Sequence, residues 1–344
     1  MIVKFAIAHA GTQPADTRPA APWQKWLRRA ARWSSPGGAR ARLSILIYHR
    51  VLANEDPLNN WDPTDLEFED QIRALSTCFT MLPLGEALER LASESLPPSA
   101  ACVTFDDGYA DNVAVALPIL KKHGVPATFF VATGYLDGGR MWNDTVIEAI
   151  RASGLAEIDL HEWGVGVLAL GDVQARRRAI RTILDKLKQV PAAEREARAM
   201  ELESMANARL PRDLMMRTEQ VSALRAAGME IGAHSVTHPI LTQVSYAAAR
   251  KEIAESRERL STILREPVSF FAYPNGRPGR DYTAEHVAMV RELGFRAAVS
   301  TAWGVATRHC DWFQLPRFTP WDRNPTKFAL RLLLNRRNTR PTTV

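Results

Sequence analysis

Residues 101–109 have the sequence ACVTFDDGY, in which a short apolar run leads directly into two aspartates and a glycine. Short apolar runs bounded by Gly, Pro or charged residues are typical of strands that are buried on both faces. Several more runs along the chain share this character. They are residues 44–48, 127–132, 229–233, 269–273 and 295–299.

Amphipathic helical periods lie between these runs, and Pro118 should kink the third of them. Strands that alternate with helices indicate a largely parallel sheet with helices outside. Chemically reactive residues follow the ends of the strands, where barrel enzymes place their sites. The sequence therefore predicts an α/β fold, a distorted (β/α) barrel over residues 43–322. The predicted helices are residues 65–78, 84–93, 111–123, 217–227, 245–264 and 282–293.

One stretch departs from this alternation. Residues 172–210 are charged and helical in period, with no strand between the helical parts. We expect a helical insertion that packs on the rim of the barrel.

The charge is concentrated at the two ends of the chain. Of the 344 residues, 46% are hydrophobic and 24% charged, as in an ordinary globular protein. Residues 1–42 form a basic N-terminal extension and residues 323–344 a basic C-terminal tail that has no acidic residue. The net charge of +6 therefore comes from the ends, and the body between them is net negative. This distribution argues against a body that binds nucleic acid.

Both ends contain a basic amphipathic segment, PWQKWLRRAARW at 22–33 and KFALRLLLNRR at 327–337. Each segment either lies on an anionic membrane surface or packs its apolar face on the body. The start of the chain does not match a signal peptide, and the three cysteines are scattered without a disulfide pattern. We therefore expect a cytoplasmic protein, with peripheral membrane contact as a possible role of the basic ends.

Asp106 and Asp107 leave a buried strand together, which is costly unless a positive charge compensates them. Adjacent side chains point in different directions, so one carboxylate can bind a metal while the other faces a substrate. His234 and His238, in HSVTHP at 234–239, have the i, i+4 spacing that places two imidazoles on one face of a helical turn. One carboxylate and two imidazoles form a reasonable hydrolytic metal site, because three protein ligands leave a position for water.

The segments TFDDGY at 104–109, HSVTHP at 234–239 and FAYPNG at 271–276 occur in this order, each after a predicted strand. This order resembles the polysaccharide deacetylase family, which shares the NodB homology domain, over about residues 43–320. The resemblance implies a distorted (β/α) barrel. It also implies that Asp107, His234 and His238 bind a divalent metal, usually zinc, and that Asp106 is the general base.

Two departures from the commoner family pattern matter. Where many members carry an arginine that orients the base, this chain has Ala272, and the late Leu-x-x-His segment that supplies the acid is absent. His309 lies in that region, but its surroundings do not match. A subgroup of biofilm-polysaccharide deacetylases has an early histidine, which His49 in IYHR resembles. We expect His49 to be the general acid, or otherwise to cap a barrel strand. Arg317 in LPRF either pairs with Asp106 or lies on the surface.

Tyr109, Trp142, Tyr273 and Pro274 are expected to bind the substrate, because each lies in or beside a segment that follows a strand. For Trp142, a place in the hydrophobic core is an equally favoured alternative. The predicted function is removal of an N-acetyl group from an amino sugar of a surface polysaccharide or a lipid-linked sugar. One alternative keeps the fold and the metal but hydrolyses a formamide or a cyclic ureide. Another is a catalytically inactive carbohydrate-binding barrel, which the presence of the base and all three ligands disfavours.

Overall fold

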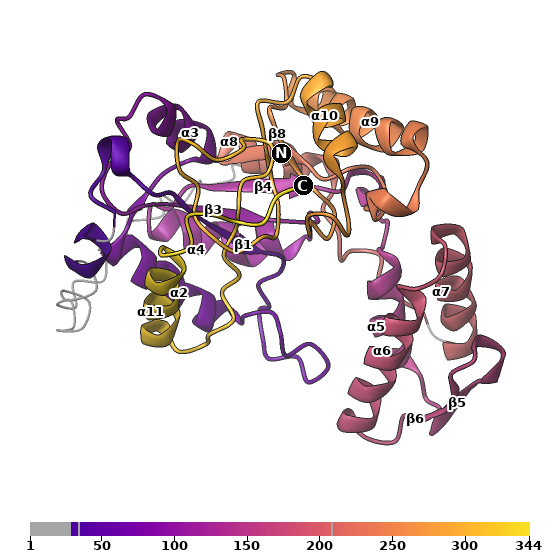
Figure 1. Ribbon diagram of the computed structural model, residues 1–344. Coiled ribbons are helices and arrows are strands. Elements are labelled where there is room, and N and C mark those ends of the chain that lie inside the picture. The colour runs from indigo at the N-terminus through magenta and orange to yellow at the C-terminus, as the bar shows by residue number, and fades with distance from the viewer. Residues whose placement is uncertain (1–28, 34, 208) are drawn as a thin grey trace, which may run out of the picture.

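The computed structural model describes residues 29–344 except 34 and 208. A curled, mainly parallel sheet lies at the centre, with helices around it (Figure 1). Most of the N-terminal extension, including residues 22–28 of its amphipathic segment, lies outside the described residues. The strands of the sheet are β1 (Ser44–Tyr48), β2 (Thr80–Met81), β3 (Ala100–Phe105), β4 (Ala127–Val131), β7 (Glu230–Ala233), β8 (Phe270–Ala272) and β9 (Ala297–Val299).

The strands follow the order β1-β3-β4-β7-β8-β9, with β2 paired to β3, and every neighbouring pair is parallel. An extended segment, residues 315–318, connects the two edges. Leu315 forms a parallel bridge with Val299 of β9, and Phe318 forms one with Leu46 of β1. The sheet thus curls towards closure, which confirms the predicted distorted (β/α) barrel.

Except for β2 and the first residue of β7, the strands are buried on both faces, and their alternating side chains fill two cores. Phe130 of β4 and Phe270 of β8 belong to the inner core, together with residues of α3. Phe129 and Phe271, one position along in each strand, belong to the outer core, where the surrounding helices pack. Successive residues at a strand end therefore face the inner and the outer core in turn, like the residues of the strand itself.

The helices around the sheet match the predicted periods closely, with one difference. The predicted helix 111–123 is divided into a π-helical turn, η2 (Asn112–Ala116), and α4 (Leu117–Lys122). Pro118 has no N–H to donate to the preceding turn, so a regular α-helix cannot continue through it. The other helices of this layer are α2 (Asp65–Cys78), α8 (Thr218–Ala226), α9 (Tyr246–Leu264), α10 (Ala284–Glu292) and α11 (Pro325–Asn335), whereas α3 (Leu84–Ala92) packs on the inner core.

A separate lobe is inserted after β4, at the lower right of Figure 1. It has its own hydrophobic core, so the predicted insertion at 172–210 is too short. The missed part includes an antiparallel hairpin in which Ile158 and Leu160 are buried while Glu157 and Asp159 are exposed. The lobe consists of α5 (Trp142–Ala152), β5 (Glu157–Leu160), β6 (Gly166–Ala169), α6 (Val173–Leu187) and α7 (Ala192–Ala206).

The C-terminal segment packs on the body. Phe328, Ala329 and Leu332 of α11 are buried in the outer core, and α11 contacts α2. Arg336 is fully buried and donates hydrogen bonds to the backbone carbonyls of Ala31 and Ala100. Of the two alternatives for this segment, packing on the body is therefore the one observed. None of the described helices is long and apolar enough to cross a membrane.

Candidate active site

The two aspartates leave β3 in different directions because the backbone changes conformation between them. Thr104 and Asp106 continue the inward-facing row of the strand, and both are buried. Asp107 has a φ of 74°, in the left-handed region, which ends the strand alternation. Gly108 follows with a φ of 89°, and a Cβ there would lie 3.0 Å from a methyl group of Val131. The turn therefore needs glycine, and it directs the Asp107 carboxylate towards the loop after β7.

That loop contains the two histidines, but it is not helical. Residues 234–239 form a turn in which Ser235 and His238 have positive φ values of 62° and 53°. The predicted helical turn is therefore wrong, although the two imidazole rings do meet, with centroids 4.7 Å apart. Glu252 of α9 holds the turn by accepting hydrogen bonds from the backbone N–H groups of Val236 and Thr237.

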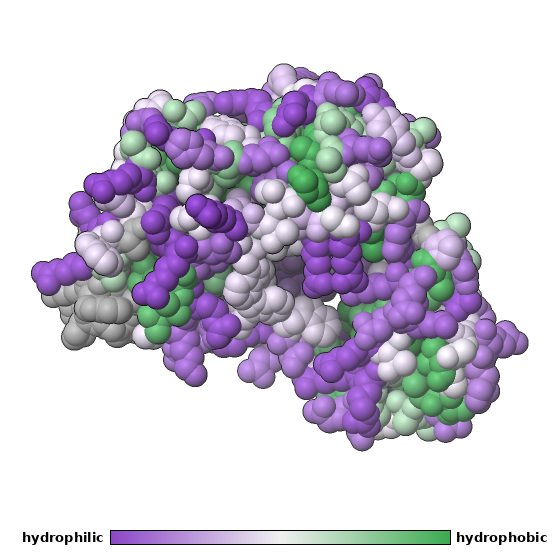
Figure 2. Space-filling view, viewed as in Figure 1, coloured by the Kyte–Doolittle hydropathy of each residue, from purple (hydrophilic) through white to green (hydrophobic). Residues whose placement is uncertain are grey.

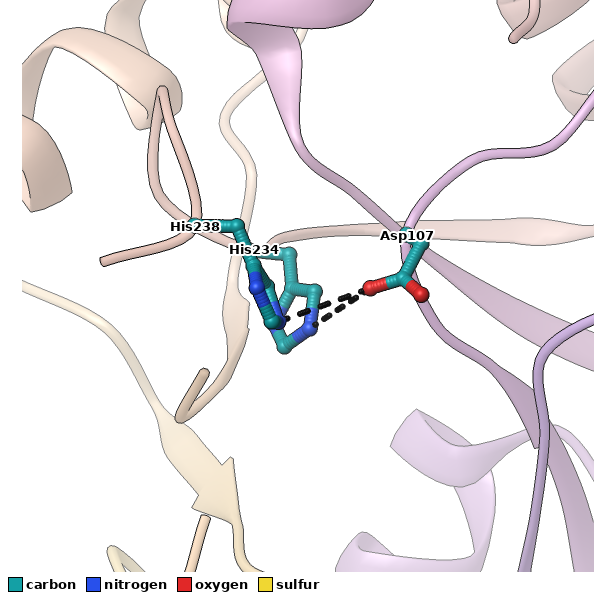
Figure 3. Close-up of side chains that lie close together, drawn as sticks. All are labelled: Asp107, His234 and His238. Carbon is teal, nitrogen blue, oxygen red and sulfur yellow. Dashed lines mark ion pairs between the residues drawn. The ribbon is translucent and has the colours of Figure 1, made fainter. Parts of the chain in front are cut away.

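Asp107, His234 and His238 converge on one point (Figure 3). Asp107 Oδ1 lies 3.4 Å from His234 Nε2 and 3.5 Å from His238 Nε2. These distances exceed those of charge-assisted hydrogen bonds. They match the roughly 3.3 Å expected between two ligands that each lie about 2.0–2.1 Å from a tetrahedral Zn²⁺. Among the described residues, Asp107 Oδ1 has no hydrogen-bond partner although it is buried.

The surroundings of the three side chains also suit a cation. His234 Nδ1 lies 2.8 Å from the carbonyl oxygen of Ala272, so its N–H points there and Nε2 is left to bind a metal. Burial alone would raise the pKa of Asp107, but the neighbouring imidazoles outweigh it and lower that pKa. Burial lowers the pKa of His238 to about 4, which keeps this ring neutral and able to act as a ligand. The donor set therefore fits a divalent metal.

Asp106 is held by a different partner. Arg317 donates two hydrogen bonds of 2.7 Å to its two carboxylate oxygens, and both side chains are buried. Arg317 also donates to the carbonyl of Ser300 and to Thr104 Oγ1. Burial would raise the pKa of Asp106, but Arg317 and His234 hold it below its usual value. The arginine that the family places in its third motif, where this chain has Ala272, thus has a counterpart in the segment that closes the sheet.

A pocket of about 340 Å³ opens above these groups, between the barrel and the inserted lobe. The space-filling view is hollowed where the main body meets the lobe (Figure 2). His49 is exposed at the end of β1 and lines the pocket with Asp107 and His238. It is close enough to contribute to lowering the pKa values of both aspartates. His309 is exposed and does not line the pocket.

The sequence profile of the polysaccharide deacetylase family matches residues 93–190 and 194–298, more than half of the chain. This chain belongs to the polysaccharide deacetylase family. Members of this family are hydrolases that act on the C–N bond of N-acetyl sugars, and they generally depend on a metal.

Known relatives agree with this assignment. Bacillus subtilis YxkH is 21% identical over 281 residues, which cover 80% of this chain and 71% of that protein. The poly-β-1,6-N-acetyl-D-glucosamine N-deacetylase of Staphylococcus epidermidis is 27% identical over 146 residues, 37% of this chain and only half of that enzyme. Two solved structures share the fold. The Streptococcus pyogenes deacetylase PplD in complex with acetate has a TM-score of 0.58 and 20% identity, and the match covers 85% of this chain and 98% of that one. IcaB from Ammonifex degensii has a TM-score of 0.52 and 20% identity, and the match covers 86% of this chain and 97% of that one.

In the structure of this deacetylase, some of the residues predicted to bind substrate line the pocket and others do not. Tyr109 and Trp142 line the pocket. Tyr273 does not, because its position in the alternation turns it outwards, where it is fully buried and stacks on Tyr282 with ring centroids 3.9 Å apart. Pro274 is buried and does not line the pocket either, whereas the next residue, Asn275, is exposed and does. Of these three residues, only Asn275 lines the pocket, so the side chains of Tyr273 and Pro274 do not lie where the sequence predicts.

Other pocket residues were missed because they follow no strand. Trp61 and Asp62 come from the irregular loop before α2, and Lys188 and Arg195 come from the lobe. Asp144, two residues after Trp142 in α5, is 3% exposed and accepts a hydrogen bond from the Tyr109 hydroxyl. Burial raises the pKa of Asp144 to about 7. Loop and lobe residues carry no periodic signal that would place them beside the barrel.

Proposed function

We propose that this protein removes the acetyl group from an N-acetylated amino sugar of a glycan or a lipid-linked sugar, using a bound zinc ion. The observation that supports this most strongly is the Asp107, His234 and His238 set beside the Asp106–Arg317 pair at the base of one pocket. One carboxylate and two imidazoles are a common zinc environment that leaves a coordination position open.

The metal, held by Asp107, His234 and His238, would polarise the scissile carbonyl and lower the pKa of the attacking water. Asp106 then takes the proton of that water. Arg317 favours this role in two ways: it keeps the carboxylate ionised at neutral pH and fixes its orientation through two hydrogen bonds. Arg317 is therefore a positioning residue.

The departing amine needs a proton, and His49 is our candidate donor. It lies on the opposite edge of the site from the histidine loop, at the end of β1, and it lines the same pocket. Its exposure lets it exchange protons with solvent between turnovers. Tyr109, Trp142 and Asn275 surround the space left for the sugar.

The test combines metal analysis with release of acetate. Purified protein is analysed for bound metals and then assayed with N-acetylglucosamine oligomers and with lipid-linked N-acetyl sugars, before and after chelation. We expect about one zinc per chain, acetate as product, and activity that is lost on chelation and restored by zinc. Formate or a ring-opened product from other amides would indicate a different scissile bond, and neither metal nor product would overturn the proposal.

A further inference from the structure

The active-site pocket continues into a second hollow on the lobe. This hollow, of about 410 Å³, runs along α6 and shares Trp61, Leu184 and Lys188 with the active-site pocket. Three shared lining residues make the two hollows direct neighbours, and we call the second one, where it follows α6, the lobe trough. A substrate longer than one sugar can therefore extend from the metal site along the lobe.

The lobe trough is basic. Arg178, Arg181 and Lys188 line it, and their spacing of three and seven residues places them on one face at α6 and its C-terminal end. All three are exposed, and no carboxylate of the described residues lies within ion-pair distance of them. Asp185 is the acidic residue that lines the trough. The positive charge of this surface is thus only partly compensated by the protein itself.

Arg195 adds a positive charge to the lining of the active-site pocket. It lies on α7 and is 4% exposed, and its guanidinium stacks over the Trp142 ring at 5.0 Å from the centroid. Its Nε is buried and has no hydrogen-bond partner in the described part of the chain. Glu196 attracts the guanidinium electrostatically, but no carboxylate of the described residues lies within ion-pair distance of it, and burial lowers the pKa of Arg195.

The other two arginines of the pocket differ in this respect. Arg50 lies 2.7 Å from Asp111, and Arg151 lies 2.6 Å from Asp56. Their charges are therefore already paired within the protein. Arg195 and the exposed Lys188, which form no ion pair with the described residues, carry the positive charge on the lobe side of the pocket.

We infer that the natural substrate carries an anionic group, a phosphate or a carboxylate, next to the N-acyl sugar, and that Arg195 and Lys188 bind it. The inference rests on the proposed function and narrows its substrate class. An arginine binds either anion through paired hydrogen bonds. Trp61, 49% exposed at the junction, offers a flat apolar surface to a sugar ring. A neutral poly-N-acetylglucosamine would gain nothing from this charge, and the amines that deacetylation creates would be repelled by it.

Two matched pairs of compounds test the inference on the full, zinc-loaded chain. N-acetylglucosamine 1-phosphate is compared with N-acetylglucosamine, and a tetrasaccharide of alternating glucuronate and N-acetylglucosamine is compared with chitotetraose. We expect kcat/KM for acetate release to be about 10-fold higher for the anionic member of at least one pair, and this preference to shrink with added salt, which screens charge. A preference in the first pair would indicate a phosphate, and a preference in the second pair would indicate a carboxylate. Equal rates, or preference for the neutral members in both pairs, would overturn the inference.

Binding of the same compounds, measured by calorimetry, separates the two proposals. If none of them releases acetate, the proposed function fails for these sugars. Tighter binding of an anionic member would then still support the anionic site, and equal or absent binding would overturn it.

Variants locate the preference within the pocket. Replacement of the buried charge in Arg195→Met should lower the anionic-to-neutral kcat/KM ratio by about 5-fold, and Lys188→Ala should lower it about 2-fold. The control is Lys186→Ala, which removes the same charge from α6 but lines neither hollow. If Arg195→Met does not fold, the exposed pair Arg181→Glu and Lys188→Glu provides the same test. An equal loss on both substrates, or an equal effect of Lys186→Ala, would contradict the assignment.

Discussion

The two walls of the active-site pocket differ in how they are built. On the barrel side, Asp107 lines the pocket and Asp106 and His234 lie beside it; all three are almost fully buried and follow strand ends, and hydrogen bonds hold Asp106 and His234 in place. On the opposite wall, Trp61 and Lys188 come from a loop and from the lobe, and both are exposed.

This difference corresponds to a division of tasks. Hydrolytic chemistry requires groups that are held to within a fraction of an ångström, which strand ends in a packed barrel provide. Recognition of a sugar tolerates looser placement and can be supplied by segments inserted between strands. Substitutions on the barrel wall should therefore change kcat, whereas those on the opposite wall should change KM.

The largest effect is expected for Asp107→Ala. Loss of this carboxylate leaves two imidazoles to hold the metal, so bound zinc should fall from about one per chain to near zero. Acetate release should fall on the order of 1,000-fold or more, because the metal contributes several kcal/mol to the transition state. Asp62→Asn is the control, since Asp62 lines the pocket but lies outside the three-residue set. Stoichiometric zinc in Asp107→Ala would require a different ligand set.

Asp106→Asn separates the base from the metal. The substitution keeps the shape of the side chain but removes its ability to take a proton, so kcat should fall by about 100- to 10,000-fold. Zinc content should remain near that of the wild type. The change also leaves Arg317 buried without its anionic partner, and a lower Tm is therefore expected. Loss of zinc together with activity would instead make Asp106 a metal ligand.

His49→Ala tests the proton donor on the far edge of the barrel wall. We expect kcat to fall about 100-fold, as is usual for loss of a general acid, with little change in stability because the side chain is exposed. His309→Ala serves as the control, since that histidine is also exposed but does not line the pocket. Deacetylation at the wild-type rate by His49→Ala would show that this residue only caps β1.

Arg317→Met should alter the pH dependence of the reaction. Arg317 holds the pKa of Asp106 below its usual value, and burial alone would raise it. Without Arg317 the carboxylate is protonated at higher pH, so the acidic limb of the kcat profile should move upwards by about one pH unit or more. Arg151→Met is the control, because Arg151 lines the same pocket but pairs with Asp56. A uniform loss of rate at every pH would mean that Arg317 acts through the orientation of Asp106 or through the fold, and not through the ionisation of Asp106.

The sequence predicts the barrel wall far better than the opposite wall, and the reason is physical. The strands before Asp106 and His234 are short runs that are buried except for Glu230, so the places of Asp106, Asp107 and His234 at strand ends follow from the sequence. The conformation of the histidine loop does not follow, because the i, i+4 spacing cannot reveal positive φ values at Ser235 and His238.

The alternation of side chains along a strand explains why Tyr273 does not lie where the sequence predicts. Tyr273 stands two residues after Phe271 and shares its outward direction, so it enters the outer core rather than the pocket. The boundaries of β8 would have revealed this orientation. By contrast, Trp61 and Arg195 are brought to the pocket by long-range packing of a loop and a lobe, which no local pattern encodes. The lobe core itself depends on a hairpin whose strands are only four residues long.

The smallest effect, and the sharpest contrast with the barrel wall, is expected for Trp61→Ala. Trp61 contacts no reacting atom in the proposed mechanism, but its ring is 49% exposed where the pocket meets the lobe trough. Loss of one aromatic stacking surface should raise KM for oligosaccharides about 3- to 10-fold and leave kcat and zinc content unchanged. Trp321→Ala is the control, because Trp321 is 59% exposed but lines neither hollow. A fall in kcat at unchanged KM would place Trp61 with the chemistry instead, and the division between the two walls would then not hold.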